Sequence, residues 1–336
     1  MRREPTFSVV LPNYNHAHYI GEALTAIVEQ SIKPNEVIVI DVASTDNSVD
    51  VIQEFVRRWP FVRFLQNQKN KGVVFTLNRG LQLATGEYVL FTAADDKILP
   101  GFFDKSLALL KAHPSASLCS TLSVLTDVEL RRLGRLPAEP PISSARYIGP
   151  AEALKLFRHS DSWIMGNATI YRTDALREGG GFREELGSFC DGFTSRMLAL
   201  RHGACFIPEE LAVWRRSPSG FATSTGRKPE AVEKIIADTR ALMLGPYAAL
   251  FPKDYVESWT KRTRHDTALG AVESGDLDAL RSALGSLSAA DQIFLKVYSR
   301  LGPAQKWAAK LYLLLRFKPE TLGAVILGKL GLRERR

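Results

Sequence analysis

The first 125 residues of the chain alternate short apolar runs with longer amphipathic ones, and this rhythm constrains the fold more than any other feature. Short runs rich in β-branched and aromatic residues are typical of buried strands, and longer periodic segments are typical of helices. The predicted strands are residues 7–11, 36–40, 61–65, 88–91 and 116–125, and the predicted helices are 20–30, 48–59, 73–84 and 99–112. Strands and helices in this order form βαβ units. The sequence therefore predicts an α/β fold with a mostly parallel sheet flanked by helices.

Polar and acidic residues gather directly after three of the predicted strands, in residues 12–15, 41–46 and 92–96. In a parallel sheet these positions share the carboxyl edge, where ligands bind. After the first strand, Tyr14 could stack on a planar base and Asn15 offers a donor and an acceptor. The alternative is a simple turn with a half-buried tyrosine. We expect the candidate site at this edge.

The second of these segments contains two acids with different expected roles. Asp41 directly follows its strand, where it could accept a hydrogen bond from the imide N–H of a uracil-like base. It could equally cap the helix that follows. Asp46 lies just before that helix, and we expect it to be a capping residue.

Asp95 and Asp96 are adjacent carboxylates at the end of a predicted buried strand, and they repel each other unless a cation compensates. Mg²⁺ or Mn²⁺ would suit such oxygen ligands together with substrate phosphates. The alternative is that Asp96 only caps helix 99–112. Asp191 is predicted to begin a helix that ends near residue 201, where the helix dipole keeps a carboxylate ionised. That position fits both a capping residue and a general base.

The remainder of the chain loses the strand–helix rhythm. Residues 126–150 contain Pro137, Pro140 and Pro141 together with several arginines and predict an exposed loop or insertion, and residues 151–214 are mixed. From residue 229 onward the pattern is helical. We therefore predict a catalytic domain at residues 1–225 and a helical C-terminal region with a basic tail at residues 226–336.

Charge is concentrated at one end of the chain. Residues 296–336 contain ten basic and two acidic residues, so they hold the whole formal net charge of +8. The predicted helix at residues 301–318 places aromatic residues such as Trp307 among lysines, a pattern typical of a helix lying on an anionic membrane. The alternative is a helix that packs on the catalytic domain with its lysines in water. No nucleic-acid-binding motif accompanies the charge, so we expect no nucleic-acid partner.

The location of the protein follows from what the sequence lacks. Its three cysteines, Cys119, Cys190 and Cys205, are too few and too far apart for a disulfide framework. Neither a signal peptide nor an apolar stretch of membrane-spanning length is present. We expect a cytoplasmic protein, with contact at the inner face of the cell membrane through the basic tail.

Five motifs in order resemble the family 2 glycosyltransferases of the GT-A fold. They are the opening Val-Val-Leu-Pro-Asn-Tyr-Asn, the later Asp-x-x-Ser-Thr-Asp-Asn-Ser, Asn78-x-Gly80 with Ala-Thr-Gly-Glu-Tyr, Ala-Asp-Asp, and Gly166-Asn167 leading to Gly-Gly-Phe. The resemblance implies transfer of a sugar from a nucleotide-diphosphate sugar to an acceptor hydroxyl with inversion, in surface polysaccharide or glycolipid synthesis. The acceptor would be a glycan or a lipid-linked sugar.

The resemblance also implies roles for individual residues. Asp95 resembles the last acid of the family's Asp-x-Asp motif, which holds Mg²⁺ or Mn²⁺ against the donor diphosphate. Asp191 falls where the family places its catalytic base. The donor-binding positions that the resemblance implies are Pro12, Tyr14, Asn15, Asp41, Asn78, Ala94 and Asp95.

The chain departs from the family pattern at several positions. Ala93 replaces the first acid of the Asp-x-Asp motif, and Cys190 replaces the acid that usually precedes the base. A weakened metal site and a catalytically impaired sugar-nucleotide-binding scaffold are therefore the alternative. His16-x-His18 lacks a third ligand at metal spacing, and we expect a solvated turn there. Trp163 could line the acceptor side of a cleft or pack in the core.

Overall fold

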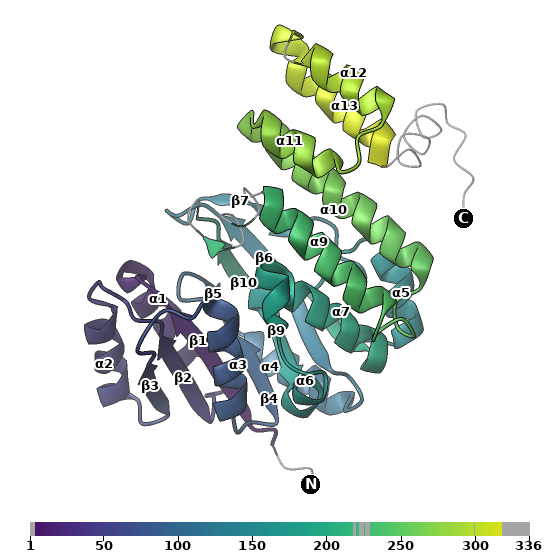
Figure 1. The fold of residues 1–336 in the computed structure, drawn as a ribbon. Helices are drawn as coiled ribbons and strands as arrows, with labels where there is room; N and C mark the ends of the chain where they lie inside the picture. The colour runs from purple at the N-terminus through teal and green to yellow at the C-terminus, as the bar shows by residue number, and fades with distance from the viewer. Residues whose placement is uncertain (1–3, 218–219, 222–224, 226–228, 299, 318–336) are drawn as a thin grey trace. The chain divides into compact units, whose positions relative to one another are not determined.

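A computed structural model describes residues 4–217, 220–221, 225, 229–298 and 300–317 of the chain (Figure 1). The chain divides into two compact units, residues 1–217 and 218–336.

The first unit is built on one sheet whose strands follow the order β3-β2-β1-β4-β9-β6-β10-β5, with β7 paired to β6 and β8 paired to β10. The strands are β1 (Phe7–Asn13), β2 (Glu36–Asp41), β3 (Val62–Gln66), β4 (Tyr88–Phe91), β5 (Lys97–Ile98), β6 (Leu118–Thr126), β7 (Arg132–Leu136), β8 (Arg146–Ile148), β9 (Thr169–Arg172) and β10 (Ala204–Arg215). The predicted strands of the first 125 residues are all present.

Most of the long strands run in one direction, as the sequence predicts. β1 pairs in parallel with both β2 and β4, β2 with β3, and β6 with β10. β9 lies antiparallel between β4 and β6 and joins the two parallel groups. Because β4 and β6 both oppose β9, they point the same way, and their carboxyl ends reach the same edge of the sheet.

Helices cover both faces of this sheet (Figure 1). They are α1 (Ala17–Val28), α2 (Ser48–Arg58), α3 (Val73–Leu83), α4 (Phe102–Ala112), α5 (Pro150–His159), α6 (Thr173–Glu178) and α7 (Cys190–His202). The alternation of side chains along β1 explains how one strand serves two layers. Val9 and Leu11 join the core with α1 and α4, whereas Val10 meets α3 at Gly80. A Cβ at Gly80 would lie 2.2 Å from Val10 Cγ1, so only glycine lets this helix approach the strand.

Residues 126–150 differ from the predicted loop because they contain two strands. β7 pairs antiparallel with β6, and β8 pairs antiparallel with β10. The side chains of the short, arginine-rich β7 are mostly exposed, so its sequence lacks the apolar pattern that would predict a strand. Arg132 instead forms a two-pronged ion pair with Glu210 on β10. Backbone pairing to neighbouring strands creates these strands, and local sequence pattern does not reveal it.

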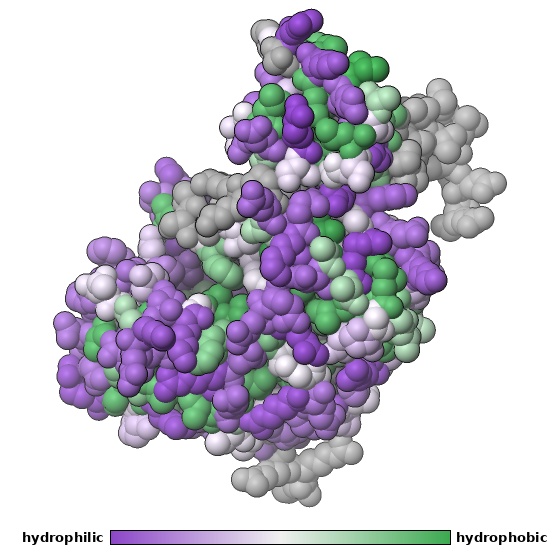
Figure 2. All heavy atoms as spheres, viewed as in Figure 1, coloured by the Kyte–Doolittle hydropathy of each residue, from purple (hydrophilic) through white to green (hydrophobic). Residues whose placement is uncertain are grey.

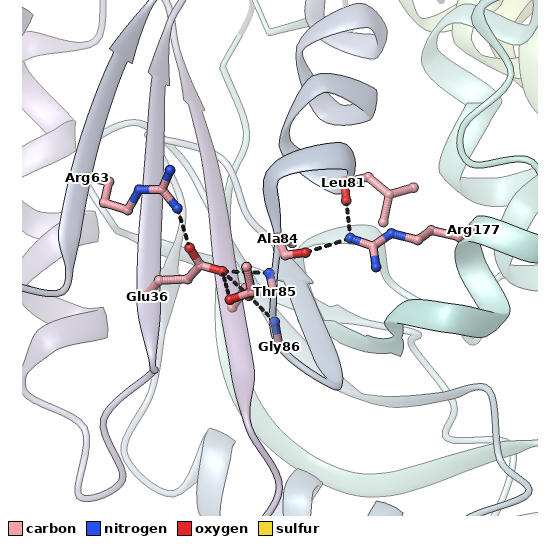
Figure 3. A network of polar contacts seen from close by, with 8 residues as sticks. Glu36, Arg63, Leu81, Ala84, Thr85, Gly86 and Arg177 are labelled. Carbon is pink, nitrogen blue, oxygen red and sulfur yellow. Dashed lines mark hydrogen bonds and ion pairs between the residues drawn. The ribbon is translucent and has the colours of Figure 1, made fainter.

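The amino edge of the sheet is closed by a buried polar network (Figure 3). Glu36 accepts hydrogen bonds from the backbone and hydroxyl of Thr85, both at 2.7 Å, and from Ser8 Oγ at 2.8 Å. Arg63 pairs with its other oxygen at 2.7 Å. A Cβ at Gly86 would lie 2.6 Å from Phe7 Cα, so the backbone passes too closely for any other residue. The Ala-Thr-Gly-Glu-Tyr motif therefore has a structural role at this edge.

The second unit is helical in its described residues, as predicted from residue 229 onward. Its helices are α9 (Pro229–Leu244), α10 (Lys253–Ser274), α11 (Leu277–Leu284), α12 (Ala289–Tyr298) and α13 (Gln305–Phe317). α10, α11, α12 and α13 share one apolar core. Within the part of the chain that the structure describes, no helix is both long and apolar enough to cross a membrane.

A buried acid joins the last two helices of this unit. Asp291 at the start of α12 is fully buried and accepts hydrogen bonds from Ser288, from Tyr312 at 2.7 Å and from Arg316 at 3.2 Å. These donors lower the pKa of Asp291 to about 2, although burial alone would raise it. Phe294 stacks on Tyr312 with ring centroids 4.0 Å apart. α13 is therefore held to α12 by one ionised carboxylate and one aromatic pair.

Candidate active site

The loops after β1 and β2 are tied to each other at the carboxyl edge. Tyr14 is 46% exposed, and Asn15 takes a positive φ of 54° that turns the chain toward α1. The Asn15 backbone N–H donates to Ser44 Oγ at 2.9 Å, and its side-chain oxygen accepts from the Thr45 N–H at 2.7 Å. The Tyr14 ring is thus left at the surface by a rigid turn, free to meet a planar ligand.

Pro12 lies at the point where β1 outlasts its neighbour. The pairing of β1 with β4 ends at Val10 and Phe91, so only β2 continues alongside Pro12. A proline is tolerated there because it removes a backbone donor that no neighbouring strand requires. This places Pro12 and the residues after it at the open end of the β1–β4 pair.

Asp41 is fully buried, and both of its oxygens are occupied by protein donors. Asn13 Nδ2 and Ser44 Oγ donate to Oδ1 at 2.8 and 2.5 Å, and the Ser44 N–H and Gln66 Nε2 donate to Oδ2 at 2.9 and 3.2 Å. A carboxylate offers about four lone-pair positions. In this structure Asp41 therefore holds the loop after β2, and its contact with a base stays a prediction.

Asp46 is a capping residue, as the sequence predicts. Its Oδ1 accepts from the Ser48 N–H at 3.0 Å, at the start of α2. Its Oδ2 accepts from the Ala17 N–H at 2.9 Å, at the start of α1. These backbone hydrogen bonds lower the pKa of Asp46 although burial raises it. One side chain thus anchors the first turns of two helices.

Asp95 and Asp96 follow β4 and point to different surroundings. Asp96 is buried and accepts from the Arg215 N–H at 3.0 Å, and burial together with the charge of Asp95 raises its pKa well above the usual range. It does not cap the following helix, because α4 begins at Phe102 after Gly101. The Asp95 carboxylate is only 14% exposed, yet it makes no hydrogen bond to any residue that the structure describes. It is therefore available to a ligand.

Three charged residues lie beside this acid pair, and the sequence singled out neither Glu22 nor Lys97. Arg215, at the end of β10, is 3% exposed and pairs with Glu22 of α1 at 2.9 Å. Lys97 pairs with the same carboxylate at 2.7 Å. Both contacts lower the pKa of Glu22. In the sequence, Arg215 directly follows an apolar run, which is compatible with a place at the site. A basic residue at such a position is equally typical of the protein surface.

Asp191 lies in the first turn of α7, as predicted, and packs against the segment before β9. A Cβ at Gly166 would lie 2.0 Å from Asp191 Oδ2, so glycine alone leaves room for this carboxylate. Burial raises the pKa of Asp191, while the Gly192 N–H at 2.7 Å and the charge of Arg196 oppose the rise. A raised pKa suits a general base.

Asn167 links the two acidic groups. It follows Gly166, which contacts Asp191, and its amide donates to Ser123 Oγ at 3.4 Å and to the Val213 carbonyl at 3.3 Å. Its hydrogen bond to Asp96 also opposes the rise in the pKa of that acid. The structure therefore brings the segment after β4, the end of β10 and the start of α7 to one edge. The sequence contains Gly166-Asn167 as a motif but gives no role to either residue.

Asn78 and Trp163 lie elsewhere. The Asn78 amide binds the backbone of Phe182 twice, at 2.8 and 2.9 Å, and so joins α3 to the Gly-Gly-Phe segment. Its role in donor binding stays a prediction. Trp163 is fully buried and stacks on Phe157 at 5.0 Å, so it packs in the core and does not line a cleft. Cys190 is buried, and burial raises the pKa of its thiol, so it supplies no charge beside Asp191.

The acids at this edge suit a divalent cation held together with a ligand. Among the described residues, no group of three His, Cys, Asp or Glu side chains could hold a metal ion by itself. The Asp95 carboxylate, however, is an unbonded hard oxygen donor whose charge already raises the pKa of its neighbour Asp96. Mg²⁺ and Mn²⁺ usually bind one or two carboxylates plus phosphate oxygens and water. The residues present fit that arrangement.

The sheet and its flanking helices have the GT-A fold, as two solved structures show. The chain aligns over 94% of its length with 92% of residues 1–349 of Staphylococcus aureus TarS in complex with UDP-GlcNAc, at a TM-score of 0.61 and 18% identity. It also aligns over 95% of its length with 88% of the mannosyltransferase PcManGT from Pyrobaculum calidifontis, in complex with GDP-Man and Mn²⁺, at a TM-score of 0.58 and 21% identity. These likenesses show the fold.

The chain belongs to glycosyl transferase family 2, whose sequence profile matches residues 8–180. An uncharacterised protein of Mycobacterium tuberculosis is 29% identical over 230 residues, which are 67% of this chain and 70% of that protein. A Bacillus subtilis protein named as a teichuronic acid biosynthesis glycosyltransferase, TuaG, is 30% identical over 113 residues, 34% of this chain and 45% of that protein. The family expected from the motifs is therefore confirmed.

Proposed function

We propose that the protein transfers a sugar from a nucleotide-diphosphate sugar to an acceptor hydroxyl with inversion at the anomeric carbon. The observation that carries the proposal is that Gly166 lies against Asp191, whose pKa is raised, while the next residue, Asn167, bonds Asp96 beside the unbonded carboxylate of Asp95. The relatives support the class of substrate. PcManGT and TarS are complexed with GDP-Man and UDP-GlcNAc, and TuaG is named for teichuronic acid biosynthesis.

Asp191 is the proposed general base. Its carboxylate takes the proton of the acceptor hydroxyl while the hydroxyl oxygen bonds to the anomeric carbon. The bond from that carbon to the diphosphate oxygen breaks on the opposite face, so the configuration inverts and the nucleotide diphosphate leaves with the electron pair. The raised pKa helps because a base accepts a proton best when its pKa approaches the working pH.

The donor would lie against the loops after β1, β2 and β4. We propose that the nucleobase of the donor stacks on the exposed ring of Tyr14, with Pro12, Asn15 and Asp41 beside it. The donor diphosphate would lie at Asp95 and the backbone near Ala94. A divalent cation, Mg²⁺ or Mn²⁺, would bind at Asp95 and neutralise charge on the departing diphosphate. The buried Arg215 and the partly exposed Lys97 lie beside Asp96, and both pair with Glu22.

The direct test measures donor binding and transfer separately. Full-length protein is screened by thermal shift against UDP-, GDP- and dTDP-sugars with and without Mn²⁺, because a ligand that binds the folded state raises the melting temperature. Asp95→Ala should abolish the Mn²⁺-dependent shift. Asp191→Asn should keep the shift and lose transfer to acceptor. A protein that binds none of these sugar nucleotides contradicts the proposal.

A catalytically impaired scaffold is the second candidate, favoured by Ala93 and by the uncharged Cys190 beside the base. It predicts that sugar nucleotides bind and are neither hydrolysed nor transferred. Turnover that disappears in Asp191→Asn would exclude it.

We place catalysis in residues 1–225, which include the first compact unit.

We further propose that α13 contacts an anionic membrane surface at the inner face of the cell membrane, close to a lipid-linked acceptor. One stripe of the helix, Ala309, Leu313 and Phe317, is buried in the core of the second unit. The opposite stripe exposes Trp307 (71%), Leu311 and Leu315 at four-residue spacing. Figure 2 shows hydrophobic residues reaching the surface in the α12–α13 part of this unit. Exposed apolar residues beside Lys306 and Lys310 suit a helix lying in a lipid interface.

A further inference from the structure

The sequence places His16 in a solvated turn, but the structure brings it to the donor edge. His16 Nδ1 lies 4.0 Å from Asp95 Oδ1, and the His16 side chain is 35% exposed. His18, two residues further on, is exposed. The two rings of the His-x-His pair therefore have different surroundings, and only the first faces the acid that the family uses for its cation.

The separation of the two groups is suited to sharing an ion. At 4.0 Å they form no direct hydrogen bond, since such bonds require about 2.7–3.2 Å. Two ligands that are each about 2.1 Å from one cation lie about 3.0 Å apart at right angles and about 4.2 Å apart when opposite. The observed distance falls inside that range. Asp95 makes no hydrogen bond within the described chain, so a shared ion would satisfy a carboxylate that protein donors leave free.

The His16 ring packs against Tyr19 of α1, which is itself covered by Arg215 at the end of β10. The edge of the His16 ring meets the Tyr19 ring, with centroids 5.9 Å apart, and the Arg215 guanidinium lies 4.3 Å from the centroid of Tyr19. The Arg215 N–H in turn binds Asp96, the neighbour of Asp95. His16 begins α1 without using its side chain as a cap. The imidazole is therefore positioned by packing while its nitrogens stay available.

We propose that His16 is the second protein ligand of the divalent cation at Asp95, in place of the acid that Ala93 has lost. The inference rests on the proposed function, because it concerns the cation that accompanies the sugar-nucleotide donor. Imidazole is a ligand for first-row transition metals, whereas Mg²⁺ is bound by oxygen ligands; Mn²⁺ is a transition metal that also suits carboxylate oxygens, so a mixed imidazole–carboxylate pair fits it better than Mg²⁺. The structure thus assigns the site to a transition-metal cation, with Mn²⁺ preferred over Mg²⁺.

Metal binding to the full-length protein tests this without any activity measurement. Mn²⁺ is titrated by electron paramagnetic resonance, alone and with UDP, for the wild type and for His16→Ala, Asp95→Ala and the matched control His18→Ala. His16→Ala should raise the Kd for Mn²⁺ at least about tenfold, because even outer-shell partners of metal ligands contribute about 10–100-fold to affinity. His18→Ala should bind as the wild type does. His16→Asp should restore affinity and shift the preference toward Mg²⁺.

A spectroscopic signature separates coordination from a general charge effect. Electron spin echo of bound Mn²⁺ should show modulation from an imidazole nitrogen in the wild type and in His18→Ala, and none in His16→Ala. Unchanged Mn²⁺ affinity in His16→Ala, or absence of nitrogen modulation in the wild type, overturns the inference. If Asp95→Ala still loses Mn²⁺ in that case, the proposed function stands. If UDP and sugar nucleotides do not bind at all, the proposed function fails as well.

Discussion

The two edges of the sheet treat their buried acids in opposite ways. At the amino edge, Glu36 receives hydrogen bonds from Ser8 and Thr85 and an ion pair from Arg63, and these contacts lower its pKa although burial raises it (Figure 3). At the carboxyl edge, burial raises the pKa of Asp96 and Asp191, and Asp95 has no hydrogen bond among the described residues. Satisfied groups stabilise a fold, whereas incompletely satisfied groups cost stability and are retained where a ligand or a reaction uses them. The contrast separates structural acids from functional ones.

The largest expected effect is at the carboxyl edge. Asp191→Asn removes the proposed base and should lower kcat by roughly a thousandfold, within the 10²–10⁴-fold typical of general-base removal. Donor affinity and the melting temperature should change little, because Asp191 makes few stabilising contacts. The control is Asp174→Asn, an exposed acid on α6. If Asp191→Asn lowers the melting temperature and leaves kcat unchanged, the two edges do not differ as described.

At the amino edge we expect the reverse. Gly86→Ala forces a Cβ to within 2.6 Å of the Phe7 and Ser8 backbone, which has no flexible side chain to move aside. Overpacking of this kind costs about 1–3 kcal/mol or more. Urea denaturation should show the loss of stability, while kcat of the folded enzyme stays unchanged. Gly134→Ala on β7, where no atom lies within 4 Å of the new Cβ, is the matched control. Equal stability of both variants would contradict the structural role of the Ala-Thr-Gly-Glu-Tyr motif.

Asp41 sharpens the comparison because it lies at the carboxyl edge but is bonded like an amino-edge acid. Asp41→Asn turns one acceptor into a donor that faces donors already present, either Ser44 N–H and Gln66 or Asn13, and it should cost about 1–3 kcal/mol. Glu36→Gln should have a similar effect. UDP affinity, measured by calorimetry well below the melting temperature, distinguishes the roles. An affinity loss without a stability loss would show that Asp41 serves the base and not the loop.

Asp291 is a buried, hydrogen-bonded acid of the second unit, and its contribution to stability should depend on pH. Its pKa in the folded protein is about 2, against an ordinary value of 3.8. The stability from its bonds is therefore fully present above about pH 4 to 5 and is lost as the pH falls toward 2. The shift corresponds to about 2 kcal/mol. Hydrogen exchange of peptides in α12 and α13 should show Asp291→Asn opening more readily than the wild type at pH 7. This difference should shrink near pH 2; a constant difference would contradict the assignment.

The smallest effect on stability is expected on α13. One stripe of its apolar side chains is buried in the core and the opposite stripe is exposed, so the two should differ as the two edges of the sheet do. The double variant Trp307→Ala, Leu311→Ala should change the unfolding free energy by about 0.5 kcal/mol or less, yet weaken sedimentation with anionic vesicles about tenfold. Leu313→Ala on the buried stripe should destabilise the protein by about 2–5 kcal/mol. Leu133→Ala, exposed in the first unit, serves as the control. Unchanged vesicle binding in the double variant would rule out the membrane contact. Point variants are needed because deletion of α13 would also remove Leu313 and Phe317 from the core.

The local sequence pattern predicted the helices and strands that have a strong apolar periodicity or a capping residue nearby in sequence. The four strands nearest the N-terminus, their helices and the cap at Asp46 all follow from apolar periodicity and capping chemistry within a few residues. β7 and β8 escaped prediction because they exist through pairing with β6 and β10. Asp96 was ambiguous for the same reason, since its partner is the distant backbone of Arg215.

The sequence by itself determined the α/β class, the family and the positions of the candidate acids, because these depend on the order of motifs along the chain. Only the tertiary structure decided which groups meet. His16 and Asp95 are far apart in sequence, and the parallel pairing of β1 with β4 brings their loops to one edge. Likewise, only packing shows that Asp41 is fully bonded while Asp95 is not. Hydrogen-bond satisfaction depends on neighbours in space, and this property separates the acids that hold the fold from those left for a ligand.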